Sequence, residues 1–428
     1  MTTLFVALVL VLLALFGAPL FSVIAAAALY GFYIAGIELQ VIGIELYRIA
    51  ETPLLMALPL FTFTGYILSE SNTSQRMLNL IQSMVGWLPG GLVILAFIFS
   101  ALFTALTGAS GVTIVALGAL LYPAIKKAGY SEKFSLGMVT ASGSLGLLLA
   151  PSLPLILYGI IAQQMDLGVQ FSINDLFIAG LLPAALMIIA LSIYSIIKSR
   201  QFNINTEPFN QSRLAQAVWA MRWELPMPVL LFAGIYSGYF AISEAAAVIA
   251  IYVLIVEMLV YREVSFSQLM NVIRESMSMV GSILLILAVS LALTNVFIDA
   301  EVPSAIFEVI KENVDSKISF LILLNLFLLF VGAILDIFSA LVIVVPLILP
   351  VAISFGIHPV HLGIIFLANM QIGYLTPPVG INLFISGYRF RKPIAEIYSA
   401  SLPFMLVLII VLLAITYIPL LSLYFIAT

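Results

Sequence analysis

The stretch "QIGYLTPPVGINLF", residues 371–384, decides how this chain folds. It lies in a long apolar segment near 362–388, yet Pro377 and Pro378 interrupt it, with a glycine on either side. Proline removes a backbone donor and clashes with the preceding helical turn, so a helix cannot run through this point unbroken. The stretch therefore predicts a helix that stops and restarts inside an apolar segment.

The composition indicates that this segment lies in a membrane. The chain has 428 residues, of which 63% are hydrophobic and 8% charged, whereas about a quarter of the residues of a soluble domain are charged. Apolar runs long enough to cross a bilayer, about 20 residues, recur from end to end. We predict an all-α polytopic membrane protein that crosses the lipid bilayer many times.

Two classes of chemistry are excluded by the same composition. The chain has no cysteine, which excludes disulfide and thiolate chemistry, and no region is basic enough to indicate a nucleic-acid partner.

The first apolar segment lacks the basic start and cleavage site of a secretory signal, so we expect it to remain as a membrane segment.

Two apolar segments, 90–124 and 318–349, are long enough for two passes but carry no polar loop at the centre. Each has a short polar tip instead, "LTGASGVT" (106–113) and "LDIFSA" (335–340). Non-helical backbone at membrane depth is tolerated only inside protein or against a wet cavity. We therefore expect two re-entrant helical hairpins beside about ten full spans.

An internal repeat connects the two hairpins. Glycine and proline positions recur at one constant offset, pairing Pro123 with Pro350, Gly129 with Gly356, Gly146 with Gly373, and Pro151 with Pro378. The order of spans, connectors, hairpin and broken span recurs as well. We predict two repeats, each with a hairpin beside a broken helix.

Charge gives the orientation. If the first hairpin enters from the cytoplasm and the second from outside, then all but three of the 16 Lys and Arg residues lie on the cytoplasmic side. The exceptions are Arg48, Lys311 and Lys317. This is the positive-inside bias, so we expect inverted repeats and both termini in the periplasm.

The repeat predicts a division into scaffold and core. We assign 1–88 to scaffold helices and connector of repeat 1, 89–160 to its core hairpin and broken helix, and 161–225 to a linking helix and cytoplasmic connector. Residues 226–316 would be the scaffold helices and connector of repeat 2, and 317–428 its core and the final helix. Connectors are expected at 38–51 and 262–276, and a span at 277–298.

Few ionisable residues lie within the apolar segments. Every Lys and Arg is expected at a segment edge, which leaves no fixed cation in the membrane interior. Asp336 lies at the second tip, and a carboxylate at that depth is a functional candidate, although it also fits the N-cap of the helix that follows. Glu244 is expected in the first turn of a helix. There its negative charge stabilises the helix dipole, or alternatively it has a direct functional role.

The broken helices indicate a transport site. Unwinding frees carbonyl oxygens, which together with Ser, Thr and Asn oxygens can replace the water around a monovalent cation, and exposed helix N-termini can hold an anion. Alternatively, the small residues only allow close helix packing. Two further alternatives are an ion channel and an intramembrane serine hydrolase using Ser110 of "GASG". A hydrolase needs a base, and only His358 and His361 are available, in a connector.

Several longer motifs resemble one known family. They are "PLLMALPLFTFTGYILSES", "MVGWLPGGL", "TGASGVTIVALGALLYPAIKKAGY", "GSLGLLLAPSLPLILYG", "SEAAAVIA" and "IGYLTPPVGINLFISG", in this order along nearly the whole chain. The chain resembles the large membrane subunit (DctM-like, or M subunit) of tripartite ATP-independent periplasmic (TRAP) transporters. It departs from the family at "TGASG", where a serine-richer "SGSS" is more frequent, and at Ala150, where a second proline is usual.

The resemblance implies a function. Such proteins are elevator-type secondary transporters, not enzymes, in the bacterial cell inner membrane. They import an organic acid, such as a C4-dicarboxylate or sialic acid, by symport with sodium ions and without an organic cofactor. The partners implied are a periplasmic substrate-binding protein (P-type) and a small four-helix membrane subunit (Q-type).

The resemblance also implies the site residues. The first sodium site would comprise Thr107, Gly108, Ala109, Ser110, Gly111, Ser142 and Gly143. The second would comprise Asp336, Ser339, Asn369, Gly373 and Thr376. The substrate would lie between the two tips, near Ser110, Thr113, Pro151, Ser339, Thr376 and Pro377.

Overall fold

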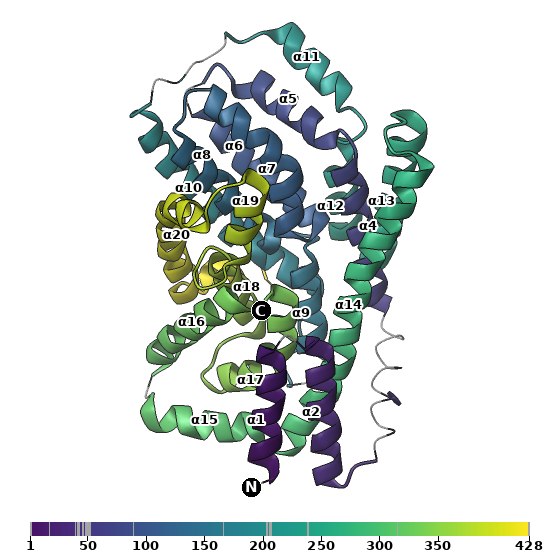
Figure 1. Ribbon diagram of the computed structural model, residues 1–428, viewed down its shortest axis with the longest axis vertical. Coiled ribbons are helices and arrows are strands. Elements are labelled where there is room, and N and C mark those ends of the chain that lie inside the picture. Colours follow the sequence, from purple (N-terminus) through teal and green to yellow (C-terminus); the bar gives the residue numbers. More distant parts are fainter. Residues whose placement is uncertain are drawn as a thin grey trace.

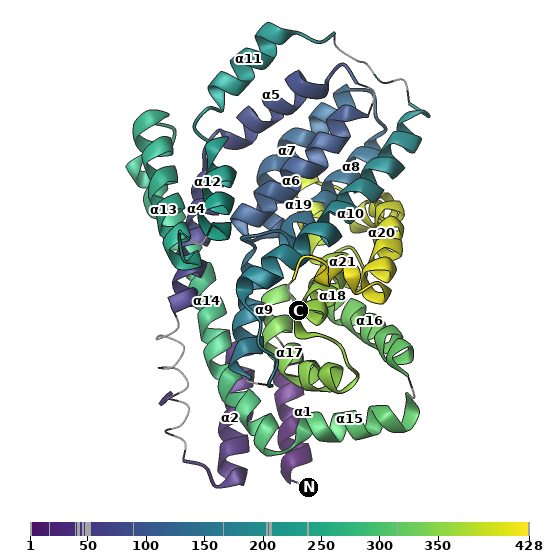
Figure 2. The ribbon, with the colours of Figure 1, turned by 180° about the vertical axis from the view of Figure 1, so that it is seen from behind.

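The computed structural model describes residues 2–426, apart from 17, 39, 41–42, 45–46, 48–52, 89, 166, 203, 205–207, 238 and 315. The described chain is helical and contains no strand, which confirms the predicted all-α class. Within it, seven helices are long and apolar enough to cross a membrane. Figures 1 and 2 show an elongated molecule whose helices mostly run along or obliquely to its long axis.

One set of helices forms a frame on one side of the molecule (Figures 1 and 2). Its members are α1 (Thr2–Leu15), α2 (Leu20–Ala35), α4 (Ala57–Glu70), α12 (Pro226–Tyr236), α13 (Ile242–Ile255) and α14 (Phe266–Asp299). Helix α2 packs on α14, and α4 packs on α13 and α14. A short 3₁₀ turn, η1 (Pro53–Met56), precedes α4, and a π-helical turn, η3 (Val256–Val260), follows α13.

Helix α14 corrects one prediction. The expected connector 262–276 and span 277–298 form one helix from Phe266 onward, because Ser265 starts it with a capping box to Gln268 and no proline interrupts the segment. Leu269 and Val272 are buried, so this polar-looking part packs like the rest of the helix. Most of the predicted connector 38–51, including Arg48, lies outside the described residues.

The two predicted hairpins are present. The first comprises α6 (Gly91–Thr107) and α7 (Ser110–Lys127), and the second α16 (Lys317–Ile334) and α17 (Ile337–Ser354). Gly108, at φ +69°, allows the first tip to turn within two residues. Figure 1 shows the first hairpin in the upper half and the second in the lower half, so the tips approach the middle from opposite ends.

The two predicted breaks are also present. The first segment consists of α8 (Glu132–Ser142), the 3₁₀ turn η2 (Leu145–Leu148) and α9 (Leu153–Gln164), and the second of α18 (Pro359–Gly373) and α19 (Ile381–Phe390). Cis peptide bonds precede Pro151 and Pro378. The Ser144 hydroxyl donates to the Gln371 carbonyl at 3.4 Å, joining residues 227 positions apart, which is the offset of the sequence repeat.

Glycine explains how closely each break approaches its hairpin. A Cβ on Gly146 would collide with the carbonyl oxygen of Ala101, in α6. A Cβ on Gly373 would lie 2.5 Å from the carbonyl carbon of Gly332, in α16. Only glycine fits at either position, so the sequence-matched pair Gly146 and Gly373 has the same packing role in both repeats.

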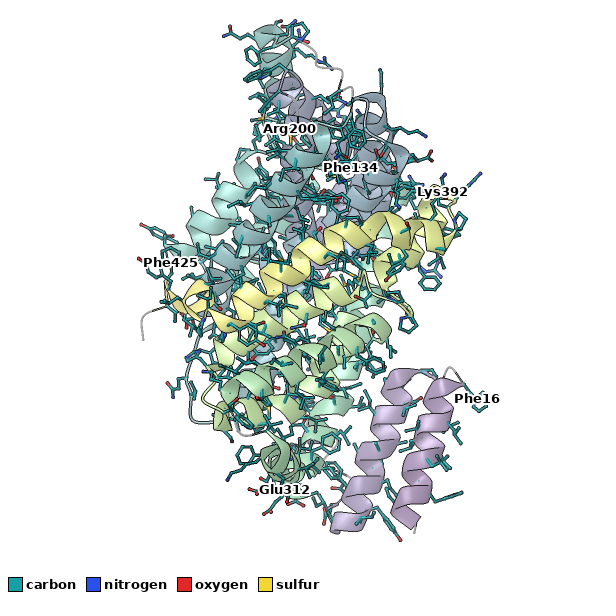
Figure 3. The ribbon with its side chains drawn as sticks, turned by 90° about the vertical axis from the view of Figure 1, so that its left-hand side faces the viewer. Phe16, Phe134, Arg200, Glu312, Lys392 and Phe425 are labelled. Atoms are coloured by element: carbon teal, nitrogen blue, oxygen red, sulfur yellow. The ribbon has the colours of Figure 1, made fainter. Side chains whose placement is uncertain are left out.

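The remaining helices cover this core. They are α5 (Thr73–Val85), α10 (Ile173–Ser199), α11 (Gln211–Ala220), α15 (Val302–Asn313), α20 (Ile394–Tyr417) and α21 (Leu420–Leu423). Helix α20 packs along α8 and α10, with the rings of Phe134 and Phe404 5.4 Å apart. Figure 3 shows Phe134 among the helices, whereas Phe16 projects outward from the turn between α1 and α2. The predicted domain boundaries and the count of about ten spans stay predictions.

Candidate functional site

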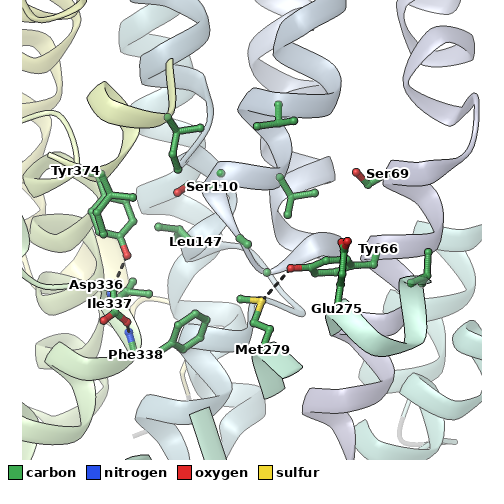
Figure 4. A pocket seen from close by; sticks show the side chains of 18 of the residues that line it. Tyr66, Ser69, Ser110, Leu147, Glu275, Met279, Asp336, Ile337, Phe338 and Tyr374 are labelled. Carbon is green, nitrogen blue, oxygen red and sulfur yellow. Dashed lines mark hydrogen bonds between the residues drawn. The ribbon is translucent and has the colours of Figure 1, made fainter. Parts of the chain in front are cut away.

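A cavity of about 740 Å³ lies where the two hairpin tips face helices α4 and α14. The first tip contributes Gly108 to Val112 and the second Asp336 to Phe338. Figure 4 shows Ser110 and Asp336 on the side of the tips and Tyr66, Glu275 and Met279 on the opposite side. Both repeats and the frame thus meet at this cavity.

The first tip is held by hydroxyl groups. The Thr104 Oγ1 atom donates to the carbonyl of Gly143 at 2.9 Å and lies 2.7 Å from Thr113 Oγ1. A Cβ on Gly143 would lie 3.3 Å from the Ser110 carbonyl oxygen, and Ser142 precedes it at the end of α8. The tip, Ser142 and Gly143 are therefore adjacent, as the predicted first sodium site requires.

Helix α4 also touches this tip. A Cβ on Gly65 would collide with the backbone of Thr107, so α4 and the tip come into backbone contact. The Thr107 hydroxyl donates only long hydrogen bonds, of 3.4 Å to Thr104 and 3.5 Å to Ala109. Thr104 and Gly65 were missed by sequence reasoning, because nothing in the sequence shows which helix packs against the tip.

The second tip is organised by Asp336. Its Oδ1 atom accepts from the backbone N–H groups of Phe338 and Ser339, both at 3.0 Å, and its Oδ2 atom accepts from the Ser339 hydroxyl. Asp336 is thus the N-cap of α17, one of the two predicted roles. The Ile337 N–H donates to the Tyr374 hydroxyl at 2.7 Å (Figure 4), which joins this tip to the broken segment.

The other residues of the predicted second site on the broken segment differ in burial: Asn369 and Gly373 are buried, and Thr376 is partly exposed. The Asn369 Nδ2 atom donates to Asn325 Oδ1 at 2.7 Å, whereas its Oδ1 atom is buried and accepts no hydrogen bond from the described residues. The Thr376 hydroxyl donates to Ile372 at 3.0 Å. No hydrogen bond in the described chain joins Asp336 to Asn369 or Thr376, and their shared role in a sodium site stays a prediction.

Of the six predicted substrate residues, Ser110 alone lines the cavity. Thr113 is buried beside Thr104. The other four are not among the lining residues: Pro151, Ser339, Thr376 and Pro377. Their role with a substrate stays a prediction.

The frame contributes residues that sequence reasoning missed. They are Tyr66, Ser69 and Glu70 from α4 and Asn271, Glu275 and Met279 from α14. The Tyr66 hydroxyl contacts the Met279 sulfur at 3.5 Å (Figure 4). Asn271 and Glu275 were missed because they fall in the segment predicted as a connector; their polarity inside a continuous helical pattern was the available signal.

The charge of the cavity is uneven. Three carboxylates line it, those of Glu70, Glu275 and Asp336, and none of the lining residues is Lys or Arg. Arg274 instead lines an adjoining hollow of about 430 Å³ together with Tyr66 and Glu275. Among the described residues, no group of three or more His, Cys, Asp or Glu side chains could hold a metal ion. A cation at the first tip would depend on carbonyl and hydroxyl oxygens, whereas the second tip also offers the carboxylate of Asp336.

The hydrolase alternative has no histidine base beside Ser110. The Nδ1 atom of His361 lies 2.7 Å from the Ser422 hydroxyl, and its Nε2 atom faces the Thr416 carbonyl. His358 caps α18 through the Val360 N–H. Both histidines are occupied away from Ser110.

A buried charge cluster lies outside the lining of the cavity. Arg76, on α5, forms salt bridges with Glu224, Glu257 and Glu263, and its side chain is 10% exposed. Arg76 follows the apolar segment 52–70, as expected of a basic residue at a segment edge, and it is buried and paired there. The sequence could not reveal this cluster, because the three glutamates lie 148 to 187 positions from Arg76.

Comparison with known proteins identifies the family. The protein-family model described as tripartite ATP-independent periplasmic transporter, DctM component, matches residues 5–421 of this chain. The chain is 33% identical to the isethionate TRAP transporter permease protein DctMQ of Oleidesulfovibrio alaskensis, over 87% of this chain and 58% of that protein. It is also 33% identical to the C4-dicarboxylate TRAP transporter large permease protein DctM of Pseudomonas aeruginosa, over 89% of this chain and 88% of that one.

A further relative and a solved structure extend the comparison. The ectoine TRAP transporter large permease protein TeaC of Halomonas elongata is 28% identical over 96% of this chain and 95% of its own. The fold is similar to that of the Alcanivorax borkumensis YdaH transporter, with a TM-score of 0.62 at 15% identity over 87% of this chain and 85% of that one. From the family match over nearly its whole length, the chain belongs to the DctM family, the large permease component of tripartite ATP-independent periplasmic transporters.

Proposed function

We propose that this permease imports an organic acid anion by symport with sodium ions. The observation that carries the proposal is the cavity between the tips, which three carboxylates and no Lys or Arg line. Two like charges 4 Å apart repel by about 4 kcal/mol at an effective dielectric constant of about 20. An anion therefore needs accompanying cations to enter this cavity, and that requirement couples its transport to sodium.

The tips are the proposed sodium sites. At the first, the Thr107–Gly111 turn beside Ser142 and Gly143 supplies carbonyl and hydroxyl oxygens. At the second, the buried Oδ1 atom of Asn369 has no donor among the described residues, and a cation would satisfy it. The N-terminus of α7 begins at the first tip without a side-chain cap, whereas Asp336 already caps that of α17. Helix N-termini attract anions, so the substrate would bind at the start of α7, close to sodium.

The substrate class rests on the charge of the cavity and on the relatives. Two of the relatives are named for isethionate and C4-dicarboxylates, which are anions, and a third for ectoine. A cavity that needs sodium to accept an anion suits a carboxylate or a sugar acid. Its size of about 740 Å³ falls in the usual range for small-molecule sites.

Two protein partners belong to the proposal. The family name describes a tripartite, periplasmic system, which supports a periplasmic substrate-binding protein as the donor of substrate. The chain spans 58% of the relative named DctMQ, and the rest of that relative supports a small second membrane component. We place the complex in a bacterial inner membrane with both termini in the periplasm.

The proposed movement is that of an elevator. The cavity lies at the boundary between the hairpin tips and the frame helices α4 and α14. If the hairpins and broken helices slide along this boundary, the site opens first to one side and then to the other. The frame would stay fixed in the bilayer.

Uptake into proteoliposomes tests the function. Vesicles containing this chain and its small membrane subunit receive a binding protein loaded with a radiolabelled dicarboxylate or sialic acid. An inward sodium gradient should drive accumulation, and an equal potassium gradient should not. Accumulation that is independent of sodium would overturn symport, and ion conductance without the binding protein would favour a channel.

A further inference from the structure

A second cavity, of about 320 Å³, lies away from the transport site, between α15 and the two arms of the second hairpin. Its lining consists only of isoleucine, leucine, phenylalanine and valine side chains. Both arms, α16 and α17, are apolar enough to lie in a membrane. Such a lining suits hydrocarbon rather than water.

The shape of this cavity is that of a groove. Its lining runs from Phe320 to Phe327 on α16 and from Val344 to Val351 on α17, which is about 10 Å along each helix. Helix α15 covers part of it and packs on α17, and Figures 1 and 2 show α15 crossing the outer end of this hairpin. Leu323 and Phe327 are 45% and 42% exposed, so the groove opens sideways.

Charged residues stand at the outer end of the groove. Lys317 begins α16, one turn before Phe320, and its ammonium group donates to the Gly356 carbonyl at 2.8 Å. Lys311 follows the lining residue Ile310 in the last turn of α15. Glu308 and Glu312 are exposed on the face of α15 opposite the lining residues Ile306 and Ile310, so they take no part in the groove. The two ammonium groups of Lys311 and Lys317 complement the phosphate of a phospholipid headgroup.

We propose that this groove binds one acyl chain of a membrane phospholipid, whose phosphate lies near Lys311 and Lys317. Apolar cavities of about 150 Å³ already stay dry and take up apolar ligands, and this one is larger and open to the bilayer. Each buried methylene group strengthens binding about fourfold. The lipid would lie between the second hairpin and α15, the helix that connects this hairpin to α14. The inference does not depend on sodium coupling.

Photolabelling tests the site. The full chain, alone and with its small membrane subunit, is reconstituted with phosphatidylethanolamine that carries a diazirine in one acyl chain, irradiated, and mapped by mass spectrometry. Label should appear on the peptides of α15 to α17 that line the groove. Val344→Phe and Leu347→Phe each place a ring in the groove and should lower this label about tenfold, the effect of losing about two buried methylene groups.

The matched control is Leu326→Phe, on the same hairpin. Leu326 is 63% exposed and does not line the groove. Labelling of the groove peptides in this variant should therefore equal that of the wild type. Lys311→Gln should lower the label without changing thermal stability. The labelling of a filling variant counts only if its unfolding temperature lies within a few degrees of that of the wild type. Two such variants are made so that the test does not depend on the folding of one of them.

Three outcomes would overturn the inference. The first is unchanged labelling in whichever filling variant folds, and the second is label confined to helices other than α15 to α17. The third is loss of the label when the small membrane subunit is present, because a protein segment would then occupy the groove.

Discussion

The backbone N–H of Ile337 donates a 2.7 Å hydrogen bond to the hydroxyl of Tyr374, and this bond ties the second hairpin tip to the second broken helix. Both residues are buried. Tyr374→Phe removes the acceptor and leaves a buried donor unpaired, which costs about 1–3 kcal/mol. Thermal unfolding of the purified protein should show this loss. Tyr388→Phe is the control, since Tyr388 is 91% exposed; equal stability of the two variants would contradict a structural role for Tyr374.

Asp336→Asn tests the charge at the second tip. An asparagine still accepts the backbone N–H groups of Phe338 and Ser339 as an N-cap, so the permease should assemble normally. Sodium-dependent uptake should weaken, because a carboxylate that can attract sodium is lost. Asp175→Asn, which alters the capping box of α10, is the control for removing a capping carboxylate elsewhere. Unchanged uptake with unchanged sodium dependence would rule out this role.

Gly373→Ala tests the close packing of the broken helix. The new Cβ would lie 2.5 Å from the Gly332 backbone, and overpacking of this kind costs about 1–3 kcal/mol. Gly281→Ala is the control, because no atom lies within 4 Å of its added Cβ and alanine favours a helix interior by about 1 kcal/mol. In denaturation experiments, Gly373→Ala should be less stable than the wild type, and Gly281→Ala should be more stable.

Arg76→Met tests the buried charge cluster. It leaves the carboxylates of Glu224 and Glu257 without their cation, and removing one partner of a buried pair costs about 3–5 kcal/mol. Lys126→Met is the control, since the Lys126–Glu132 pair is largely exposed and such a pair contributes about 1 kcal/mol or less. A second change, Glu257→Gln, should recover part of the loss. Equal stability of the Arg76 and Lys126 variants would show that the cluster is not stabilising.

Single cysteines test the orientation. The chain has no cysteine, so Arg200→Cys and Glu312→Cys each give one reactive thiol, and the two residues lie toward opposite ends of the long axis (Figure 3). A membrane-impermeant maleimide should label Glu312→Cys from the periplasm. It should label Arg200→Cys only after the inner membrane is permeabilised. The reverse pattern would place both termini in the cytoplasm.

The sequence predicted the features that depend on local chemistry. The breaks around Pro151 and Pro378, and the polar tips at Ser110 and Asp336, interrupt apolar helices, and such interruptions are visible residue by residue. The boundary of α14 was wrong because polar residues such as Asn271 and Glu275 were read as a connector. In the structure they face a cavity, so their polarity reflected a wet surface on a continuous helix.

The contacts that depend on tertiary packing could not be predicted. Tyr66 meets Met279 across 213 positions, and Arg76 meets three carboxylates from distant segments. Nothing in a single sequence states which helices pair. The same limit applies to the apolar groove, since its lining residues read as ordinary membrane-facing side chains.

Helix α14 has a mechanical consequence. Its 34 residues run without interruption for about 50 Å, and a regular helix changes neither length nor direction cheaply. It is therefore a rigid rod, and if the second hairpin moves as proposed, the change of direction would fall beyond the end of this helix. That end is the corner at Ala300 and Glu301, where Glu301 has a left-handed backbone at φ +51°. In the proposed movement, this two-residue corner would concentrate the bending at one point in the chain.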